Sequence, residues 1–169
     1  MSLNFVPDYY FEKFNDVSAD FLKSIGVKGI LLDIDNTLEP YEHDEPGEHV
    51  ITWLKSLEEA GIKAAIVSNN NLERVEKFNK DINLVAFHKS KKPFKKRLLA
   101  AMELIKSEKE TTVFMGDQIF TDVWAAHNAG IKSILVPPIN DKRDLFTKFK
   151  RLLEKPFLRK FRKKKGNSK

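Results

Sequence analysis

The sequence predicts an α/β protein, a three-layer α/β/α sandwich built on a five-stranded, parallel, Rossmann-like sheet. Short apolar runs recur along the chain, and amphipathic segments with helical spacing separate them. Alternation of strands with helices favours parallel pairing through right-handed crossover connections. The chain has 169 residues, which fits one domain with a sizeable core.

The first strand expected in the chain is buried and is predicted by the apolar run at residues 28–34. Residues 47–61 predict a helix, because apolar side chains recur there at helical spacing and Gly61 can cap its end. A strand, a short helix and a further strand are expected at residues 63–69, 71–80 and 83–87.

The second half repeats this alternation. We expect a helix over residues 92–107 with Pro93 at its first position, where a proline fits best. A second helix is expected from Thr121, a capping residue, to Gly130, a stop signal. Strands at residues 111–117 and 132–138 complete the predicted sheet.

The charge of the chain is unevenly distributed. The net charge is +6, but residues 148–169 hold 11 Lys or Arg and a single acid, Glu154, for a net charge of +10. The rest of the chain therefore carries 6 − 10 = −4. We expect one domain over residues 1–155, including an N-terminal extension, and a basic tail over residues 156–169.

The tail leaves three alternatives open. Apolar side chains recur at helical spacing over residues 145–161, and Pro156 is expected to break the helix or to start a new one. This segment could be a helix packed on the domain and followed by a basic end. It could instead lie on an anionic membrane surface, or contact RNA.

The composition bears on the compartment. The chain has no cysteine, which excludes disulfides and fits a reducing compartment. The N-terminus does not resemble a signal peptide, and no apolar run approaches the roughly 20 residues of a membrane span. We therefore expect a cytoplasmic protein, with a peripheral position on the inner face of the membrane as an option. The histidines have no ligand spacing and are expected at the surface or in ordinary packing.

Polar residues follow the predicted strands, where such sheets bind their ligands. They are Asp33, Asp35, Ser68, Asn69, Lys92 and Asp117. Clustered carboxylates repel one another unless a cation joins them, and oxygen ligands without His or Cys suit Mg²⁺. Together with a lysine and a hydroxyl group, such a site can hold a phosphoryl group. A carboxylate can also attack phosphorus to form an aspartyl-phosphate.

Four segments, taken in order, resemble the motifs of the haloacid dehalogenase superfamily of phosphotransferases. They are "DIDNT" with Asp33 and Asp35, "IVSNN" with Ser68, "KKP" with Lys92, and "GDQIFTD" with Asp117 and Asp122. The resemblance spans about residues 28–138 and implies the same fold.

The resemblance also implies a role for each motif residue. Asp33 is the expected nucleophile and a ligand of Mg²⁺. Asp35 is the expected general acid and base and gives its backbone carbonyl to the metal. Asp117 is a further ligand, and Asp122 supports the ligands or holds Lys92. The phosphate group is expected to contact Asn36, Thr37, Ser68, Asn69 and Lys92.

Longer stretches, such as "GVKGILLDIDNTL" and "GDQIFTDVWAAHNAG", resemble the YqeG family of small bacterial phosphatases (subfamily IIIA). That family is similar to phosphatidylglycerophosphate phosphatases. The intervals between the motifs leave no room for an inserted cap domain, so we expect an open site. Phosphatidylglycerophosphate, a lipid headgroup presented at a membrane, is the lead substrate.

Other functions remain open. The enzyme could act on phosphoproteins or nucleotides, or the chain could be a non-catalytic module of the same fold that binds RNA or a ribosomal partner. The intact pair Asp33 and Asp35 argues against a pure scaffold. A receiver domain is excluded because its phosphorylated aspartate would end the third strand, and residues 83–87 end without one.

Overall fold

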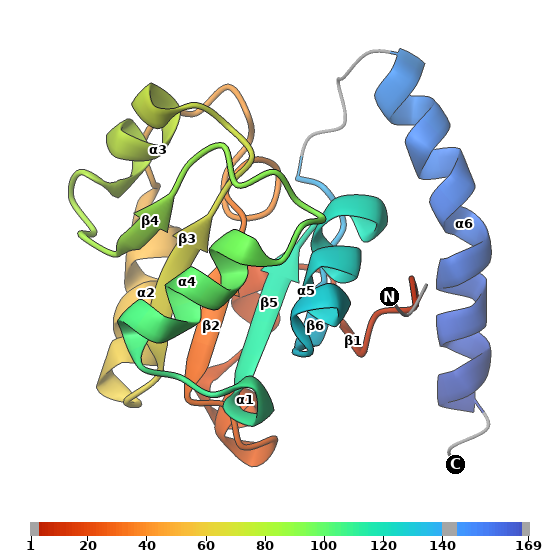
Figure 1. The fold of residues 1–169 in the computed structure, drawn as a ribbon, viewed down its shortest axis with the longest axis horizontal. Coiled ribbons are helices and arrows are strands. Elements are labelled where there is room, and N and C mark those ends of the chain that lie inside the picture. Colours follow the sequence, from red (N-terminus) through yellow and green to blue (C-terminus); the bar gives the residue numbers. More distant parts are fainter. Residues whose placement is uncertain (1–3, 140–144, 167–169) are drawn as a thin grey trace.

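The structure, a computed structural model, describes residues 4–139 and 145–166. One sheet of six parallel strands forms its centre, in the order β1-β6-β5-β2-β3-β4 (Figure 1). The strands are β1 (Tyr9–Tyr10), β2 (Gly29–Leu32), β3 (Lys63–Val67), β4 (Val85–Phe87), β5 (Thr112–Gly116) and β6 (Lys132–Leu135). The predicted fold class is confirmed.

The predicted count of five strands was one too low. The additional strand, β1, pairs Tyr9 with Ile134 and Tyr10 with Leu135 of β6 at the edge of the sheet. Two residues are too few to produce a periodic pattern, so no sequence pattern indicated this strand.

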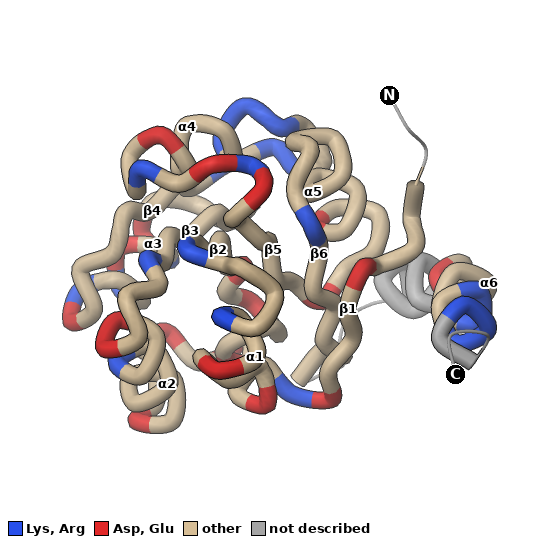
Figure 2. Tube along the Cα trace, turned by 90° about the horizontal axis from the view of Figure 1, so that it is seen from below, with Lys and Arg blue, Asp and Glu red and all other residues tan. Residues whose placement is uncertain are grey.

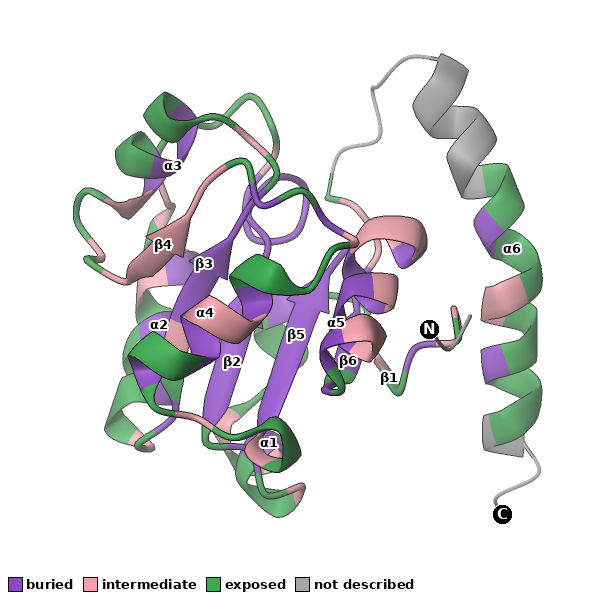
Figure 3. Ribbon diagram, viewed as in Figure 1, coloured by how far each residue is buried: buried purple, intermediate pink, exposed green. Residues whose placement is uncertain are grey.

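Helices cover both faces of the sheet. The core on one face includes side chains from α1 (Ala19–Ser24), α2 (Glu48–Glu59) and α3 (Leu72–Asn79). The core on the other includes side chains from α4 (Lys96–Ile105) and α5 (Trp124–Ala129). Figure 3 shows the central strands buried between these layers, as a three-layer sandwich requires. Short 3₁₀ turns lie at Phe14–Asp16 and Lys109–Thr111.

The sheet order determines where the polar motifs meet. Strand β2 lies between β5 and β3, with Leu32 paired to Met115 on one side and to Ile66 on the other. Asp33 therefore leaves the sheet between the ends of β3 and β5, the strands that precede Ser68 and Asp117. One helix, α2, connects β2 to β3, so the described residues of this interval hold no inserted domain.

Two predicted helix starts were wrong. Helix α4 begins at Lys96, and Pro93 lies before it, after a cis Lys92–Pro93 peptide bond. The side chain of Asn69 hydrogen-bonds both the N–H and the carbonyl of Lys92, which holds this residue in a loop.

The second incorrect start concerns the segment before α5. Its first turn is a π-helical turn, η3 (Ile119–Val123), so Thr121 lies inside the helical segment and does not cap it. The free N–H groups at its start are bound by two carboxylates. Glu154 accepts from the N–H of Ile119, and Asp122 accepts from that of Gln118. Glu154 is remote in sequence, so local patterns could not identify it.

The long helix α6 (Leu145–Gly166) lies beside the N-terminal segment (Figure 1). Phe157 stacks edge-to-face on Phe5, and the ring of Phe161 lies 6.3 Å from that of Tyr10. Pro156 does not break the helix as expected. It is exposed, and so is Leu152, whose carbonyl loses a partner to the proline and can bind water instead. Among the described residues, no helix has the length and apolarity needed to span a membrane.

Candidate active site

A buried lysine joins two carboxylates at the end of the sheet. The Lys92 Nζ atom lies 2.9 Å from Asp33 Oδ1 and 2.7 Å from Asp122 Oδ1. All three side chains are less than a tenth exposed. Asp33 follows β2, Asp122 lies in η3, and Lys92 follows β4, so the fold brings three distant segments together.

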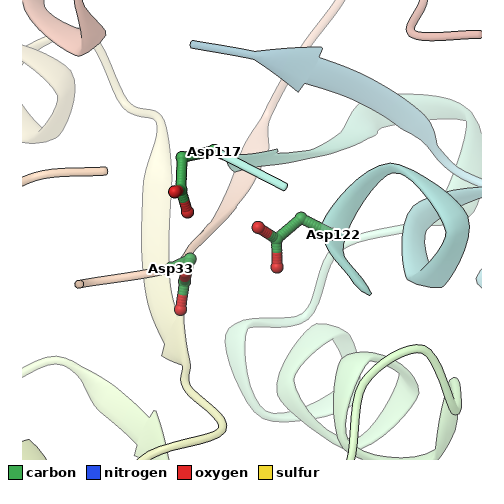
Figure 4. A group of neighbouring side chains, drawn as sticks. All are labelled: Asp33, Asp117 and Asp122. Atoms are coloured by element: carbon green, nitrogen blue, oxygen red, sulfur yellow. The ribbon is translucent and has the colours of Figure 1, made fainter. Parts of the chain in front are cut away.

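Asp117 completes a group of three carboxylates. One oxygen from each of Asp33, Asp117 and Asp122 lies within 4.8 Å of the others, and Figure 4 shows the three carboxylates turned toward a shared space. Asp117 is oriented by Thr37, whose Oγ1 donates to its Oδ1 at 3.2 Å. Gly116 is needed beside this group, because a Cβ atom there would lie 2.4 Å from the carboxyl carbon of Asp122.

The electrostatics of the group favour a bound cation. Burial raises the pKa of Asp33 to about 8. The attraction of Lys92 opposes this rise, and the repulsion from Asp122 and Asp117 adds to it. Burial would lower the pKa of Lys92, but Asp122 and Asp33 raise it above its ordinary value, so the lysine stays charged. One lysine therefore does not balance three carboxylates.

These residues fit a small divalent cation. The donors are carboxylate oxygens that converge on one point, and no histidine takes part in the group. Mg²⁺ prefers such oxygen ligands and usually retains several waters. The convergence of three buried carboxylates on one point, with a single lysine beside them, is the observation that supports this fit.

The segment after β3 holds the backbone of Lys92 through Asn69. Asn69 Oδ1 accepts from the Lys92 N–H at 2.8 Å, and Asn69 Nδ2 donates to the Lys92 carbonyl at 3.4 Å. Ser68 is buried, and its Oγ accepts from the N–H of Asn70. Because it accepts there, the Ser68 hydroxyl keeps its proton for an anionic oxygen.

Asp35 is held apart from the group of three carboxylates. Its Oδ1 accepts from Nε of Arg74 at 3.0 Å, and its Oδ2 accepts from Nδ2 of Asn70 at 2.9 Å. The side chain therefore has a fixed direction before any substrate arrives.

A cavity of about 360 Å³ opens in front of these groups. It is lined by Asp33, Asp35, Tyr41, Ser68, Asn69, Asn70, Lys92, Gln118 and Thr121. Asn36 and Thr37, expected at the phosphate group, do not line it. Asn36 accepts from the N–H of Tyr41 in the turn after β2, at a φ of 60°, and Thr37 orients Asp117.

Sequence reasoning missed several residues of this site. Arg74 lies on the apolar face of α3 beside Val75 and Phe78, and all three are buried. A charged residue at a core position of an amphipathic helix is a signal that could have identified it. Tyr41 lies in the turn after the first motif, and Gln118 lies within the fourth motif, just before η3. Nothing in their spacing distinguishes them from other loop residues.

Residues 17–136 match the family "Haloacid dehalogenase-like hydrolase". The "Probable phosphatase YqeG" of Bacillus subtilis (strain 168) is 34% identical over 154 residues, which cover 91% of this chain and 90% of that protein. The relative therefore matches nearly end to end.

Solved structures share the fold at low sequence identity. A Had-superfamily hydrolase from Ehrlichia chaffeensis has a TM-score of 0.54 and 20% identity, over 75% of this chain and 96% of that one. The cobalt-bound deoxy-D-mannose-octulosonate 8-phosphate phosphatase of Haemophilus influenzae has a TM-score of 0.56 and 14% identity, over 79% and 90%. The 3-deoxy-D-manno-octulosonate 8-phosphate phosphatase of Moraxella catarrhalis, solved with magnesium and phosphate ions, has a TM-score of 0.52 and 18% identity, over 71% and 72%.

Proposed function

This chain belongs to the haloacid dehalogenase-like hydrolase family, in the group of the YqeG phosphatase, and we propose that it hydrolyses phosphate monoesters through an aspartyl-phosphate at Asp33. The observation that carries the proposal is the contact between Asp33 and Lys92 at the edge of the cavity, beside two further carboxylates. A nucleophile, a cation for the phosphoryl oxygens and a metal site then lie within one small space.

In the first step, an oxygen of Asp33 attacks phosphorus and the bond from phosphorus to the ester oxygen breaks. Asp35, protonated at this stage, gives its proton to the departing alkoxide. Lys92 and the Ser68 hydroxyl hold the phosphoryl oxygens. The side chain of Asp35 lines the same cavity as Asp33 but stands apart from the three carboxylates, as separate roles require.

In the second step, Asp35 takes a proton from water, whose oxygen attacks phosphorus. The bond between phosphorus and Asp33 breaks, and inorganic phosphate and free Asp33 result. The residues that would hold Mg²⁺ are Asp33 and Asp117, with the backbone carbonyl of Asp35, while Asp122 holds Lys92. When bound, the ion supplies positive charge that keeps Asp33 ionised and offsets the charge of the phosphoryl oxygens.

The first test replaces the nucleophile. Asp33→Asn should abolish turnover of p-nitrophenyl phosphate, because an amide cannot attack phosphorus, while the thermal unfolding midpoint stays within a few degrees. Asp35→Asn should turn over the substrate slowly and accumulate the aspartyl-phosphate form of the protein. An acid quench should trap this phosphoenzyme, and hydroxylamine should cleave it. If Asp33→Asn keeps activity within about tenfold, roughly 1.4 kcal/mol of barrier, the covalent mechanism is wrong.

The lead substrate is phosphatidylglycerophosphate. Two observations support a substrate presented at a membrane: the site has no inserted domain over it in the described residues, and the exposed side of α6 is basic. Rates with this lipid in mixed micelles should exceed those with nucleotide, sugar and peptide phosphates at equal concentration. If any of the soluble phosphates has a higher kcat/KM, phosphatidylglycerophosphate is not the preferred substrate.

A further inference from the structure

Arg74 is a buried cation outside the four motifs. It lies on α3, on the side facing the core, and only 7% of its surface is exposed. Buried charges are costly unless they are paired and hydrogen-bonded. Arg74 satisfies this requirement in part with a catalytic residue of the proposed mechanism, since its Nε donates to Asp35 Oδ1 at 3.0 Å. Its buried Nη2 has no hydrogen-bond partner among the described residues.

Other contacts hold the guanidinium of Arg74 independently of Asp35. Its Nη1 donates to the backbone carbonyl of Asp44 at 2.7 Å, and its plane lies over the ring of Phe78, 5.6 Å from the centroid. The backbone N–H of Arg74 donates to the side chain of Asn71, which caps α3. The guanidinium therefore has a fixed place against which Asp35 is aligned.

The second oxygen of Asp35 is also held. Asn70 Nδ2 donates to Asp35 Oδ2 at 2.9 Å, and the backbone N–H of Asn70 donates to Ser68 Oγ at 3.1 Å. One segment thus connects the acid and base of the proposed reaction to the hydroxyl group that would bind phosphate. Rotation of the Asp35 carboxyl group would break both of its hydrogen bonds.

We propose that Arg74 is a positioning residue that aims the carboxyl group of Asp35 at the leaving group and at the attacking water. The inference rests on the proposed function, because it assigns a partner to the acid and base of that reaction. Arginine suits this role because one planar group donates to Asp35 and to the Asp44 carbonyl at once, which a lysine ammonium on a flexible stem cannot reproduce.

The test uses leaving groups of different basicity. A p-nitrophenolate leaves without a proton, whereas the more basic phenolate of phenyl phosphate benefits from one. Arg74→Gln should therefore lower kcat/KM for phenyl phosphate by roughly 100-fold, within the range of general acid catalysis, and for p-nitrophenyl phosphate by less than about tenfold. Arg74→Lys, which keeps a charge in the buried position, should show the same selective loss even if Arg74→Gln folds poorly.

Arg97 offers a matched control. Its guanidinium also lies over a phenylalanine ring, that of Phe87, at 5.3 Å, but its side chain is exposed and has no contact with Asp35. Arg97→Gln should leave both values of kcat/KM within about twofold of the wild type, since surface changes away from the site have small effects.

A double-mutant cycle separates this inference from the proposed function. If Arg74 acts through Asp35, adding Arg74→Gln to Asp35→Asn should lower kcat/KM for phenyl phosphate by less than about twofold further. Equal losses on both substrates, or a full additional loss in the Asp35→Asn background, would show that Arg74 acts elsewhere and overturn the inference. If Asp35→Asn alone leaves kcat/KM unchanged, the acid and base assignment of the proposed function fails instead.

Discussion

Asp33 has to lose a proton before it can attack phosphorus or bind a metal ion, and its surroundings work against this loss. Its pKa is raised to about 8 by burial and by the neighbouring carboxylates. Lys92 contacts it but also contacts Asp122, so the positive charge is shared. The residue that the proposed chemistry needs as an anion is therefore largely protonated at neutral pH until a cation binds.

This predicts that Mg²⁺ and protons compete for Asp33. Because the pKa of the free residue is raised to about 8, a proton must leave for Mg²⁺ to bind at lower pH. Affinity for Mg²⁺ should rise as the pH rises toward 8 and level off above it, by up to about tenfold per pH unit. Calorimetric titration with Mg²⁺ near pH 6.5 and pH 8.5 measures this.

The control for this prediction is Asp33→Asn, which removes the titrating group. Its affinity for Mg²⁺ should be weaker and nearly independent of pH over the same range. Wild-type affinity that stays constant between the two pH values would contradict a protonated Asp33 in the free enzyme.

The nine site residues predicted from the sequence differ in how far their places could be foreseen. Five of them line the cavity, and their places could be foreseen because ligands bind beyond the carboxyl ends of parallel strands, where these residues follow in the sequence. They are Asp33, Asp35, Ser68, Asn69 and Lys92. Asn36 contacts Tyr41 within the loop after β2, and Thr37 contacts Asp117 after β5; both contacts depend on the geometry of that loop, which the sequence did not reveal. The buried position of Arg74 could be read from the pattern of α3, but its partner Asp35 could not, because the two are 39 residues apart.

At the scale of elements, the longer strands and the amphipathic helices were predictable because each produces its own pattern of apolar residues. The errors lie where distant side chains determine the ends. Asn69 holds Lys92 in a loop before α4, and Glu154 binds the first N–H of η3. Strand β1 exists because β6 offers it an edge, and its own two residues carry no periodic signal.

The link from α6 to η3 predicts an effect of Glu154 on catalysis. Glu154 and Ile119 are both buried, so Glu154→Ala leaves a buried N–H without this acceptor, at a cost of about 1–3 kcal/mol. Because Asp122 lies in the same helical turn and holds Lys92, kcat for p-nitrophenyl phosphate should fall together with the thermal unfolding midpoint.

Two control variants test whether the hydrogen bond from Ile119 to Glu154 causes these losses. Glu154→Gln keeps a carbonyl oxygen that can accept from Ile119 and should lose less stability. Glu103→Ala, at an exposed position on α4, should change neither the unfolding midpoint nor kcat. A stable and fully active Glu154→Ala protein would mean that α6 does not support the site.

A second interaction fixes β1 and depends on pH. Asp8 Oδ2 accepts from the N–H of Ser133 at 2.8 Å and lies 2.9 Å from Nε2 of His127, whose Nδ1 lies 2.6 Å from the carbonyl of Asn4. Burial would lower the pKa of His127, but its hydrogen bonds to Asp8 and Asn4 raise it. Burial would raise the pKa of Asp8, but His127 and Ser133 lower it.

The two shifts define a pH window for the stability that this interaction contributes. Because the pKa of His127 is raised, its ionised form contributes to the stability of the fold. This contribution is fully present below about pH 6.5 and is lost as the pH rises through the folded pKa. The lowered pKa of Asp8 gives a contribution to stability that is present above about pH 4 and is lost as the pH falls through the folded pKa. His127→Ala should therefore lower the unfolding midpoint more at about pH 5.5 than at about pH 8.5.

Thermal unfolding followed by circular dichroism measures this difference. The matched variant His88→Ala removes a histidine outside this network of hydrogen bonds and so controls for the loss of an imidazole. An equal deficit for His127→Ala at both pH values would show that its ionisation does not contribute.

Across the whole molecule, the described N-terminal segment and α6 pack together beside β1, at the edge of the sheet. Phe5 contacts Phe120, Trp124 and Phe157, and so joins the N-terminal segment, the helical segment after β5 and α6. Phe157 and Leu158 of α6 pack on the body, whereas Arg159, Lys160, Arg162 and Lys163 are exposed. Figure 2 shows the Lys and Arg positions of the described part of the helix in blue. This packing agrees with the first of the three alternatives for the tail and leaves its basic surface available.

The basic surface of α6 predicts binding to anionic membranes. Truncation at residue 156 would also remove Phe157 and Phe161, which pack on the body, so neutralising charges is the cleaner change. Arg159, Lys160 and Lys163 are exposed, and each basic residue near a membrane contributes about 1 kcal/mol. Replacing the three with Gln should weaken binding to phosphatidylglycerol vesicles by roughly 100-fold, measured by sedimentation.

The control makes the same change in charge elsewhere. Lys13, Lys23 and Lys55 are exposed on the body, and replacing them with Gln should weaken vesicle binding far less, because they lie outside the basic surface of α6. Wild-type protein should leave the vesicles as salt rises, since screening weakens the attraction. Both triple variants should keep wild-type activity on p-nitrophenyl phosphate, because none of the six residues lines the cavity. Equal vesicle binding by the two variants, or none by the wild type, would exclude α6 as a membrane contact and leave it as a helix that supports the catalytic domain.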